Sequence, residues 1–262
     1  MTQELAGRVA IVTGGAGGLG RGIVELVVRE GAKVVIADID AEQGKAVAAE
    51  LGPDVASTET DVADPDDVQH AVDFAVEEFG RLDIMVNNAG IGGTHHRFLN
   101  DDLRDFDRGM AVNLFGVMTG SQRAGRYMAE HGGGVIVNIT SIGGINAGPG
   151  MAVYRAAKAA VIHFTRCIAI DLAEHGIRVN CVAPAHIPTA INTTYDQSEI
   201  VRRMQPLQRI GSPDDVANAV LFLASERAAQ ITGIVMPVDG GTTAGPPPVD
   251  VRKLVAKRGD SQ

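Results

Sequence analysis

Three residues whose side chains could together move a proton lie between positions 135 and 181: Ser141, Tyr154 and Lys158. Tyr154 and Lys158 are four residues apart in a segment whose apolar residues recur every three or four positions, which predicts a helix with both side chains on one face. A free tyrosine has a pKa of about 10 and exchanges protons poorly at neutral pH. A neighbouring ammonium group favours the phenolate and lowers that pKa, so this pair is suited to proton exchange with a carbonyl or hydroxyl oxygen.

Ser141 directly follows the apolar run Val135–Thr140, which is typical of a buried parallel strand. Open α/β sheets bind ligands at the carboxyl ends of such strands, so we expect its hydroxyl where a substrate would lie. A tyrosine and a lysine at this spacing are also common on protein surfaces, and the pair alone is a weak signal. The other motifs of the chain therefore decide whether the three residues form a site.

A glycine-rich turn lies between a predicted strand and a predicted helix near the N-terminus. The β-branched run Arg8–Thr13 leads into Thr13–Gly20 (TGGAGGLG), and apolar residues at helical spacing follow up to Gly31. Glycines let a backbone approach a pyrophosphate closely, and the start of the helix offers free N–H groups and the positive end of its dipole. This order predicts a dinucleotide phosphate site, with a tight turn that binds no ligand as the alternative.

Asp38 closes a second buried run, Lys33–Ala37, about 20 residues beyond the glycines. A carboxylate there is placed to accept hydrogen bonds from an adenosine ribose and would repel a 2′-phosphate. The positions where a basic residue might bind that phosphate, Gly17 and Ile39, are uncharged. Asp38 therefore favours NAD over NADP, with an exposed aspartate that merely starts a turn as the alternative.

Strand and helix patterns alternate along the whole chain. This order predicts an α/β fold, a single-domain Rossmann-type doubly wound sheet of about seven parallel strands with helices on both faces. Helices are expected at Ala41–Leu51, Asp64–Phe79, Asp101–Glu130 and Val216–Ala224, besides those that follow Gly20 and contain Tyr154. Asp64–Asp67 have the residue types of a helix start, and Ser212–Asp215 supply an N-cap, a first-turn proline and a capping-box acid ahead of Val216. The remaining strands are expected at Val55–Thr60, Leu82–Val86, Ile177–Val182 and Ile234–Val238.

The domain boundary is expected near residue 243. Residues 1–243 would form one NAD-binding catalytic domain that includes a substrate loop at residues 186–206. Within this loop, residues 190–206 are polar and aperiodic and could act as a mobile cover over a site. Residues 244–262 hold three consecutive prolines and scattered charge, and are predicted to form an extended tail.

Composition narrows the class of protein. The chain has 262 residues, of which 45% are hydrophobic, and a net charge of −9, which argues against nucleic acid and anionic membrane as main partners. No apolar run approaches the roughly 18 residues of a membrane span, and no secretory signal precedes the first strand. We therefore expect a soluble, cytoplasmic protein. The two cysteines, Cys167 and Cys181, are expected to be buried reduced thiols, and no metal site is expected.

The sequence resembles the classical short-chain dehydrogenase/reductase family over about residues 6–243. Five motifs match in the family's order: T-G-x-x-x-G-x-G at Thr13–Gly20, N-N-A-G at Asn87–Gly90, Asn113, Ser141, and Y-x-x-x-K at Tyr154–Lys158. Each is moderately specific alone, and together they are strong. Enoyl reductase members of the family have a wider Tyr–Lys spacing.

The resemblance implies a role for each matching residue. Tyr154 would donate or accept the proton, and Lys158 would bind the nicotinamide ribose and lower the pKa of Tyr154. Ser141 would hydrogen-bond the substrate oxygen, and Asn113, otherwise interpretable as a surface residue, would hold a water in a proton relay. The cofactor-binding set would comprise Gly14, Gly18, Leu19 and Gly20 in the glycine turn, Asp38 at the ribose, Asp61 and Val62 at the adenine, Asn88, Ala89 and Gly90 in the cleft, and Ile187 and Thr189 at the carboxamide. Family members commonly form homotetramers, which is the assembly expected here.

Two positions depart from the family pattern. Pro184-Ala185 stands where Pro-Gly is usual after the sixth strand, and Ala157 replaces the common serine before the lysine. His95, His96 and His186 are interpreted as polar loop residues, with substrate contact as the alternative because their loops lie on the ligand side of the sheet.

The leading hypothesis is an NAD-dependent oxidoreductase that interconverts a secondary alcohol and a ketone. A 3-oxoacyl-carrier-protein reductase is the nearest alternative, although such enzymes mostly use NADPH. A nucleotide-sensing protein without catalytic activity is the other. The substrate pocket would come from residues 91–99, 142–151 and 186–206, whose sequence does not indicate a particular substrate.

Overall fold

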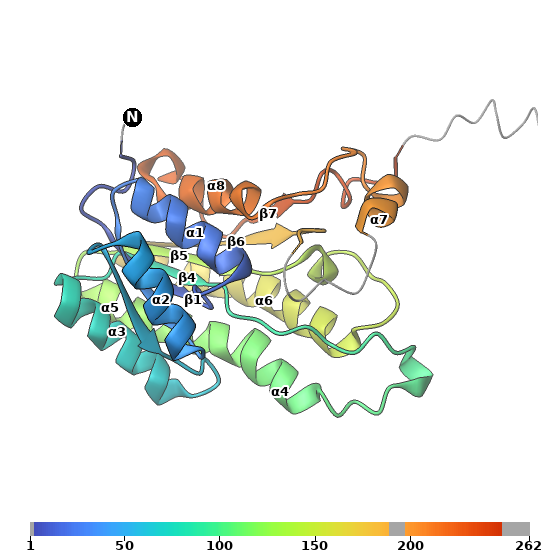
Figure 1. Cartoon of the computed structure of the whole chain (residues 1–262), viewed down its shortest axis with the longest axis horizontal. Helices are drawn as coiled ribbons and strands as arrows, with labels where there is room; N and C mark the ends of the chain where they lie inside the picture. The colour runs from blue at the N-terminus through green and yellow to red at the C-terminus, as the bar shows by residue number, and fades with distance from the viewer. Residues whose placement is uncertain (1–2, 189–196, 248–262) are drawn as a thin grey trace, which may run out of the picture.

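The seven strands that the computed structural model describes run parallel in one sheet, in the order β3-β2-β1-β4-β5-β6-β7 (Figure 1). The structure describes residues 3–188 and 197–247. The predicted number and direction of the strands are confirmed, and their ends differ from the expected ones by no more than two residues. The strands are β1 Val9–Thr13, β2 Lys33–Asp38, β3 Val55–Glu59, β4 Ile84–Asn87, β5 Gly134–Ile139, β6 Ile177–Pro184 and β7 Val235–Val238.

Helices cover both faces of this sheet, as a doubly wound fold requires (Figure 1). One apolar core joins the sheet to α1 (Gly18–Arg29), α2 (Ala41–Leu51) and α8 (Pro213–Ala224). A second core on the opposite face holds side chains of α3 (Pro65–Phe79), α5 (Gly116–Glu130) and α6 (Ala152–Asp171). Because both faces are covered, strands β1, β4 and β6 are buried along almost their whole length, which explains their continuous apolar runs.

Local signals position these helices. Asp64 caps α3 by accepting a hydrogen bond from the Asp66 N–H, Pro65 occupies the first turn, and Gly80 ends the helix in the left-handed region. Ser212 and Asp215 form a capping box at the start of α8. Both helix starts were predicted from these residue types, and the structure confirms them.

The long helix expected over Asp101–Glu130 begins five residues late, at Phe106. Leu103 has φ +56, which a right-handed helix cannot accommodate, and a single 3₁₀ turn, η1 (Phe98–Asn100), precedes it. The helix then runs as α4 (Phe106–Met110), a π-helical turn η2 (Ala111–Phe115) and α5. Short π-helical segments of this kind are frequent at functional sites.

Two other expectations concern the C-terminal third. Residues 197–204, expected to be aperiodic, form helix α7 (Gln197–Met204). The expected tail is described only for residues 244–247, of which Ala244 belongs to a turn and residues 245–247 have no regular secondary structure; residues 248–262 lie outside the described part.

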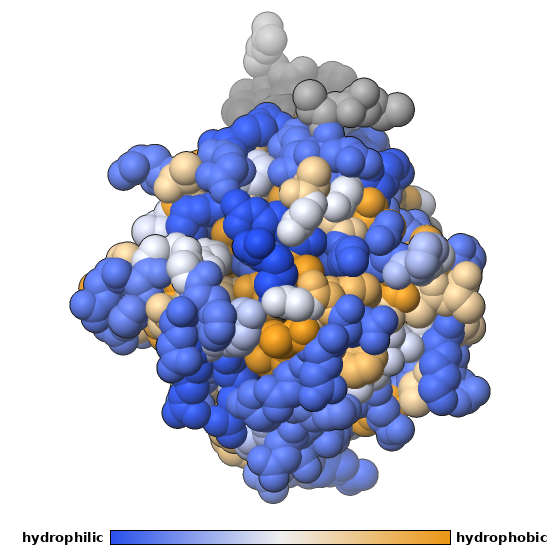
Figure 2. Space-filling model, turned by 90° about the vertical axis from the view of Figure 1, so that its left-hand side faces the viewer, coloured by the Kyte–Doolittle hydropathy of each residue, from blue (hydrophilic) through white to orange (hydrophobic). Residues whose placement is uncertain are grey.

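The sheet brings the predicted motifs to one edge. The chain passes from β1 to β2 and β3 on one side and then returns to β4 on the other, so β1 and β4 are neighbours where the strand order reverses. Ligands of open α/β sheets bind at the carboxyl ends of the strands at such a point. Figure 2 shows the face of the molecule that lies at the left of Figure 1. This face is mostly hydrophilic, with apolar residues gathered near its centre.

Candidate active site

The glycine turn after β1 has the geometry that its sequence predicts. Gly14 and Gly18 have φ of +64 and +55, values that other residues rarely adopt. A Cβ atom on Gly20 would lie 2.0 Å from the Gly14 carbonyl oxygen, so this residue must be glycine for α1 to start so close to the strand. The turn therefore presents bare backbone at the start of a twelve-residue helix.

Asn88, the second asparagine of the N-N-A-G motif, holds this turn from the neighbouring strand. Its Nδ2 donates to the carbonyl oxygens of Thr13 (2.8 Å) and Gly14 (3.1 Å). In return, the Thr13 Oγ1 accepts from the backbone N–H groups of Asn88 (2.9 Å) and Ala89 (3.0 Å). The turn and the end of β4 thus form one rigid unit, which explains why both motifs occur together.

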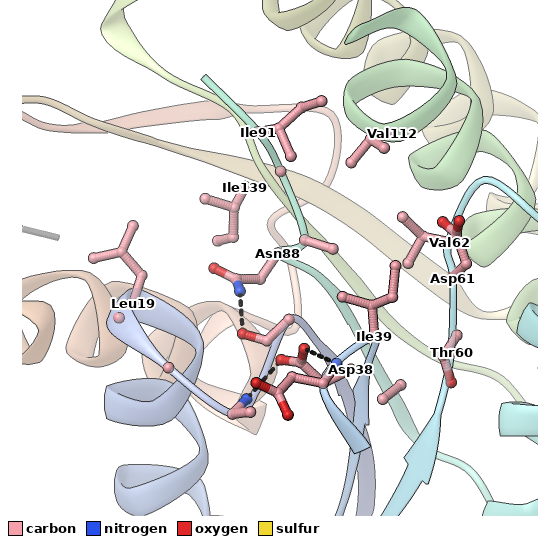
Figure 3. A pocket seen from close by; sticks show the side chains of 18 of the residues that line it. Leu19, Asp38, Ile39, Thr60, Asp61, Val62, Asn88, Ile91, Val112 and Ile139 are labelled. Atoms are coloured by element: carbon pink, nitrogen blue, oxygen red, sulfur yellow. Dashed lines mark hydrogen bonds between the residues drawn. The ribbon is translucent and has the colours of Figure 1, made fainter. Parts of the chain in front are cut away.

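Asp38 lies at the end of β2 and points toward the glycine turn (Figure 3). One carboxylate oxygen accepts from the Ala16 N–H (2.9 Å) and the other from the Asp40 N–H (3.0 Å). Two backbone donors fix the carboxylate in place while leaving lone pairs on both oxygens free for further donors. This is the arrangement that a ribose diol could use.

A cavity of about 430 Å³ runs along this edge of the sheet. We refer to it as the switch-point cavity. Its walls include Gly14, Gly18, Leu19, Asp38, Asp61, Val62, Asn88, Ala89, Gly90, Tyr154 and Lys158, all of which the sequence assigns to the site, together with further residues such as Ile39, Ile91, Arg108, Val112, Ile139 and Thr140.

The other described residues of the predicted set are not among those that line this cavity. Gly20 packs against the Gly14 carbonyl group, and Ser141 and Asn113 are the sequence neighbours of the wall residues Thr140 and Val112. Ile187 is buried (2% exposed) and belongs to one of the apolar cores. Thr189 lies outside the described residues.

Tyr154 and Lys158 share one end of the cavity, on successive turns of α6. The Lys158 Nζ lies 5.8 Å from the centre of the Tyr154 ring and donates to the Ile139 carbonyl oxygen at 3.1 Å. Burial lowers the pKa of Lys158 to about 8, because desolvation disfavours the ammonium form. The two side chains therefore reach one common point, as their spacing predicts.

The expected lowering of the Tyr154 pKa is wrong in direction. Burial raises the pKa of Tyr154, and this outweighs the opposite effects of its hydrogen bond with Ser141 and of the nearby positive charge of Arg155. The spacing of Tyr154 and Lys158 indicates only the charge of the lysine. Desolvation of the phenol depends on how deeply the helix packs, which the sequence does not show.

Ser141 begins the segment that connects β5 to α6. Its Oγ accepts from the Gly143 N–H (3.0 Å), which caps the 3₁₀ turn η3 (Ile142–Gly144), and its side chain also hydrogen-bonds with Tyr154. The serine hydroxyl and the phenol are thus side by side, as the resemblance implies.

Asn113 is buried within the π-helical turn, and its interpretation as a surface residue is wrong. Its Oδ1 accepts from the Ile91 N–H (3.1 Å) and its Nδ2 donates to the Ile91 carbonyl oxygen (2.9 Å). This pair of hydrogen bonds fixes the segment that leaves β4 beside the cavity. The role in a water relay stays a prediction, and it would have to use main-chain groups because the side chain is engaged.

Asp61 has a charged partner in the cavity that the sequence did not predict. Arg108 on α4 pairs with Asp61, which follows β3, through its Nη1 at 2.9 and 3.3 Å from the two carboxylate oxygens. Burial alone would raise the pKa of Asp61, but the hydrogen bonds from the Ala63 N–H and Arg108 outweigh it, and the pKa is lowered. The contact joins elements 47 residues apart in sequence, so only the fold reveals it.

The histidines flank the site in different ways. His95 and His96 are exposed on the segment after β4. His186 is partly buried, its pKa is lowered by burial, and its Nε2 has no hydrogen-bond partner among the described residues. It lines a second cavity of about 320 Å³ with Gln205, Asp239 and neighbours rather than the switch-point cavity.

Comparison with known proteins decides the family. A family model described as enoyl-(acyl carrier protein) reductase matches residues 14–243. (+)-Borneol dehydrogenase 2 of Salvia officinalis is 43% identical over 257 residues, which cover 92% of this chain and 91% of that protein. Zerumbone synthase of Zingiber zerumbet is 40% identical and covers 91% and 96% of the two chains. The chain belongs to the short-chain dehydrogenase/reductase family.

Solved structures of other short-chain dehydrogenases/reductases share the fold. The 3-ketoacyl-(acyl-carrier-protein) reductase of Brucella melitensis, complexed with NADH, superposes with a TM-score of 0.86 at 36% identity, over 91% of this chain and 99% of that one. Levodione reductase gives a TM-score of 0.87 at 34% identity, over 92% and 99%. These two proteins are reductases by name and (+)-borneol dehydrogenase 2 is a dehydrogenase by name, so the chain is a short-chain oxidoreductase.

The two departures from the family pattern have simple structural settings. Ala157 is fully buried where α6 faces the sheet, and the Ala185 N–H donates to the Val238 carbonyl oxygen at 3.1 Å. Among the described residues, no group of three metal-ligand side chains could hold a metal ion, and no helix is long and apolar enough to cross a membrane.

Proposed function

We propose that this short-chain dehydrogenase/reductase interconverts a secondary alcohol and a ketone with NAD as cofactor. The observation that carries the proposal is the switch-point cavity, which has the fixed carboxylate of Asp38 at one end and Tyr154 with Lys158 at the other. A dinucleotide is the kind of ligand that needs a glycine turn, a ribose acceptor and a catalytic group along one cleft.

The residues fit this cofactor. Gly14 and Gly18 would accommodate its pyrophosphate, Asp38 would accept from the adenosine ribose hydroxyls, and Lys158 would donate to the nicotinamide ribose. When bound, the nicotinamide would supply the hydride acceptor or donor.

The protein's own groups handle the proton. In alcohol oxidation, the Tyr154 phenolate would accept the hydroxyl proton while the carbinol carbon loses its hydride, and ketone reduction would reverse both transfers. Ser141 would hydrogen-bond the substrate oxygen and hold it beside the phenol. The positive charge of Lys158 would favour the phenolate most when the site is closed to water, because charges interact more strongly in a low dielectric.

The preference for NAD over NADP rests on Asp38. A 2′-phosphate would face this carboxylate, and neither Gly17 nor Ile39 carries a compensating charge. The reductase of Brucella melitensis was solved with NADH, which supports NAD use in a similar fold.

The substrate hydroxyl is proposed to lie on a bulky apolar ring system. Relatives are named for borneol, for a 3β-hydroxysteroid and for a dichlorocyclohexadienediol. In this chain the 3₁₀ turn η1, which follows β4, exposes Phe98 and Leu99, which are 68% and 95% exposed. Large apolar side chains at this end of the sheet suit an apolar substrate better than a charged one.

A 3-oxoacyl-carrier-protein reductase remains the second candidate, since the family model and one solved relative carry related descriptions. That relative contains NADH, so NAD use alone does not separate the two functions. The Tyr154–Lys158 spacing of four residues favours alcohol and ketone chemistry over enoyl reduction.

Homotetramer formation and the cytoplasmic location stay predictions. Support for assembly comes from the groove between α5 and α6, where Phe115 and Met118 are 45% and 40% exposed, and from Ile170 on α6, which is 78% exposed. Apolar side chains of this size on neighbouring helices suit a second copy of the chain. Light scattering that gives the mass of a monomer at micromolar concentration would contradict this assembly.

The function is tested by following NADH absorbance. Purified protein is mixed with NAD and a panel of cyclic and acyclic secondary alcohols, and separately with NADH and the matching ketones or a 3-oxoacyl thioester. The proposal expects turnover of cyclic alcohols with NAD. Turnover of the thioester alone would favour the second candidate, and no turnover of any compound would favour a non-catalytic protein.

A further inference from the structure

The residue after the catalytic tyrosine, Arg155, has an unusual set of partners. Its side chain lies in the first turn of α6, where Nε donates to the Gly150 carbonyl oxygen (3.2 Å) and Nη1 donates to the Asn146 carbonyl oxygen (3.1 Å). No carboxylate of the described residues lies within ion-pair distance of it. A partly buried guanidinium group that bonds only to backbone carbonyls is holding a segment of chain rather than balancing a charge.

That segment, residues 142–150, connects the catalytic Ser141 to the helix that carries Tyr154. It packs so closely on α6 that a Cβ atom on Gly144 would lie 2.7 Å from the Lys158 carbonyl group, and one on Gly148 would lie 2.9 Å from the Arg155 Nη2. Glycines cost conformational entropy when they are ordered, so a connection rich in them needs contacts that fix its path. Arg155 supplies two such contacts from the helix itself.

The backbone is also fixed at Met151, directly after this segment. Met151 adopts φ +54, an unfavourable value for a residue with a side chain, and its N–H donates to the Thr94 carbonyl oxygen at 3.0 Å. Strain of this kind persists only where the surroundings fix the backbone. Hydrogen bonds to Arg155 and to the Thr94 carbonyl group therefore both fix this connection, which lies next to the predicted substrate pocket.

We infer that Arg155 is a positioning residue, which braces residues 142–150 against α6 and so sets the distance between Ser141 and the Tyr154 phenol. The inference rests on the proposed function for its kinetic consequences. Its positive charge also lowers the pKa of Tyr154, which partly offsets the effect of burial. The contacts of Arg155 lie at the substrate end of the site, and Arg155 makes no hydrogen bond with the described residues of the glycine turn or with Asp38.

The test compares Arg155→Met, Arg155→Lys and the matched control Arg29→Met in the full chain. Arg29 is exposed at the end of α1, far from the site in the sequence. Arg155→Met keeps an unbranched side chain but loses both donors, so we expect kcat/KM for the alcohol to fall about tenfold or more. The KM for NAD should not change, and amide hydrogen exchange should become faster within residues 142–150. Arg155→Lys, which retains one donor and the charge, should recover part of the loss.

Three results would overturn the inference: unchanged kcat/KM for the alcohol in Arg155→Met, a KM for NAD that rises as much as the KM for the alcohol, or unchanged hydrogen exchange in residues 142–150. If the wild type turns over no alcohol, the proposed function fails, but hydrogen exchange still decides whether Arg155 braces the segment.

Discussion

The charged side chains at the two ends of the switch-point cavity differ in sign and in exposure to solvent. At the Tyr154 end, the Lys158 ammonium group is 3% exposed and donates to a backbone carbonyl, and no carboxylate of the described residues pairs with it. At the Asp38 end, the carboxylates of Asp38 and Asp61 are partly exposed and are held by backbone N–H groups, with Arg108 pairing to Asp61.

This difference indicates what each end contributes. A buried cation without a carboxylate partner costs folding stability and is retained where its charge is needed for chemistry. Partly exposed carboxylates with fixed orientation cost little, and they select a ligand by the hydrogen bonds that they offer. The Tyr154 end should therefore control turnover, and the Asp38 end should control which cofactor binds and how tightly.

The largest effect is expected from Tyr154→Phe. The substitution keeps the ring and its packing and removes only the phenol oxygen, so kcat should fall by about 10²–10⁴-fold, the usual contribution of a general acid–base group. Binding of NAD, measured by calorimetry, should not change. Tyr127→Phe on α5, where the ring stacks on His131, is the matched control and should keep full activity. A Tyr154→Phe enzyme with near-normal kcat would remove the phenol from the mechanism.

Lys158→Met should separate catalysis from stability. Activity should fall by about ten- to a hundredfold, as expected for the loss of a charged hydrogen bond. In the absence of NAD, however, the variant should unfold at a higher temperature than the wild type at pH 7. The pKa of Lys158 falls from 10.5 to about 8 on folding, so the buried ammonium form opposes folding below pH 8.

The pH dependence gives a sharper version of this test. Between pH 8 and 10.5 the unfolded wild type holds more protons than the folded protein, so its free energy of unfolding should rise with pH over this window. The excess in the free energy of unfolding of Lys158→Met over the wild type should shrink in the same pH window. Thermal unfolding at several pH values would measure it, and a variant less stable than the wild type at every pH would contradict the cost assigned to Lys158.

Asp38→Ala should change cofactor choice more than turnover. The wild type should prefer NAD by about tenfold or more in kcat/KM, because a difference of one charge-assisted hydrogen bond suffices for that factor. Asp38→Ala should narrow the preference, and Asp38→Ala with Ile39→Arg should narrow it further by supplying a partner for the 2′-phosphate. The exposed Asp73 on α3 provides a control, since Asp73→Ala should leave the ratio unchanged. Equal use of NADPH by the wild type would show that Asp38 does not select the cofactor.

The smallest effect is expected from Arg108→Gln. Asp61 would lose its ion pair but keep the Ala63 N–H, and the pair is half exposed, so NAD should bind only a few-fold more weakly with kcat unchanged. Arg104→Gln, which breaks an exposed pair with Asp102 on the same segment of chain, is the control. An effect on kcat larger than the effect on NAD binding would contradict the assignment of turnover to the Tyr154 end and of cofactor binding to the Asp38 end.

Much of the fold was predictable because its signals are local. Runs of β-branched residues marked the strands, and caps such as Asp64 and Ser212 marked helix starts. The glycine turn and Asp38 were predictable for the same reason, since strand, turn, helix and carboxylate follow one another in the sequence.

Features that depend on distant segments were not predictable. The long helix was placed five residues too early because the positive φ of Leu103 has no signal in its residue type. Asn113 is buried only because Ile91 from the β4 end offers it two hydrogen bonds, and Arg108 reaches Asp61 only through the fold. The direction of the Tyr154 pKa shift likewise follows from the depth of burial rather than from spacing.

The most direct test of the proposed function follows the hydrogen atom itself. The best alcohol from the substrate panel, carrying deuterium on its carbinol carbon, is incubated with the wild-type enzyme and NAD, and the reduced cofactor is analysed by mass spectrometry. Hydride transfer predicts reduced NAD that carries the deuterium, formed by the wild type and not above background by Tyr154→Phe. Reduced cofactor without deuterium, or ketone formed with no reduced NAD, would contradict the proposed reaction.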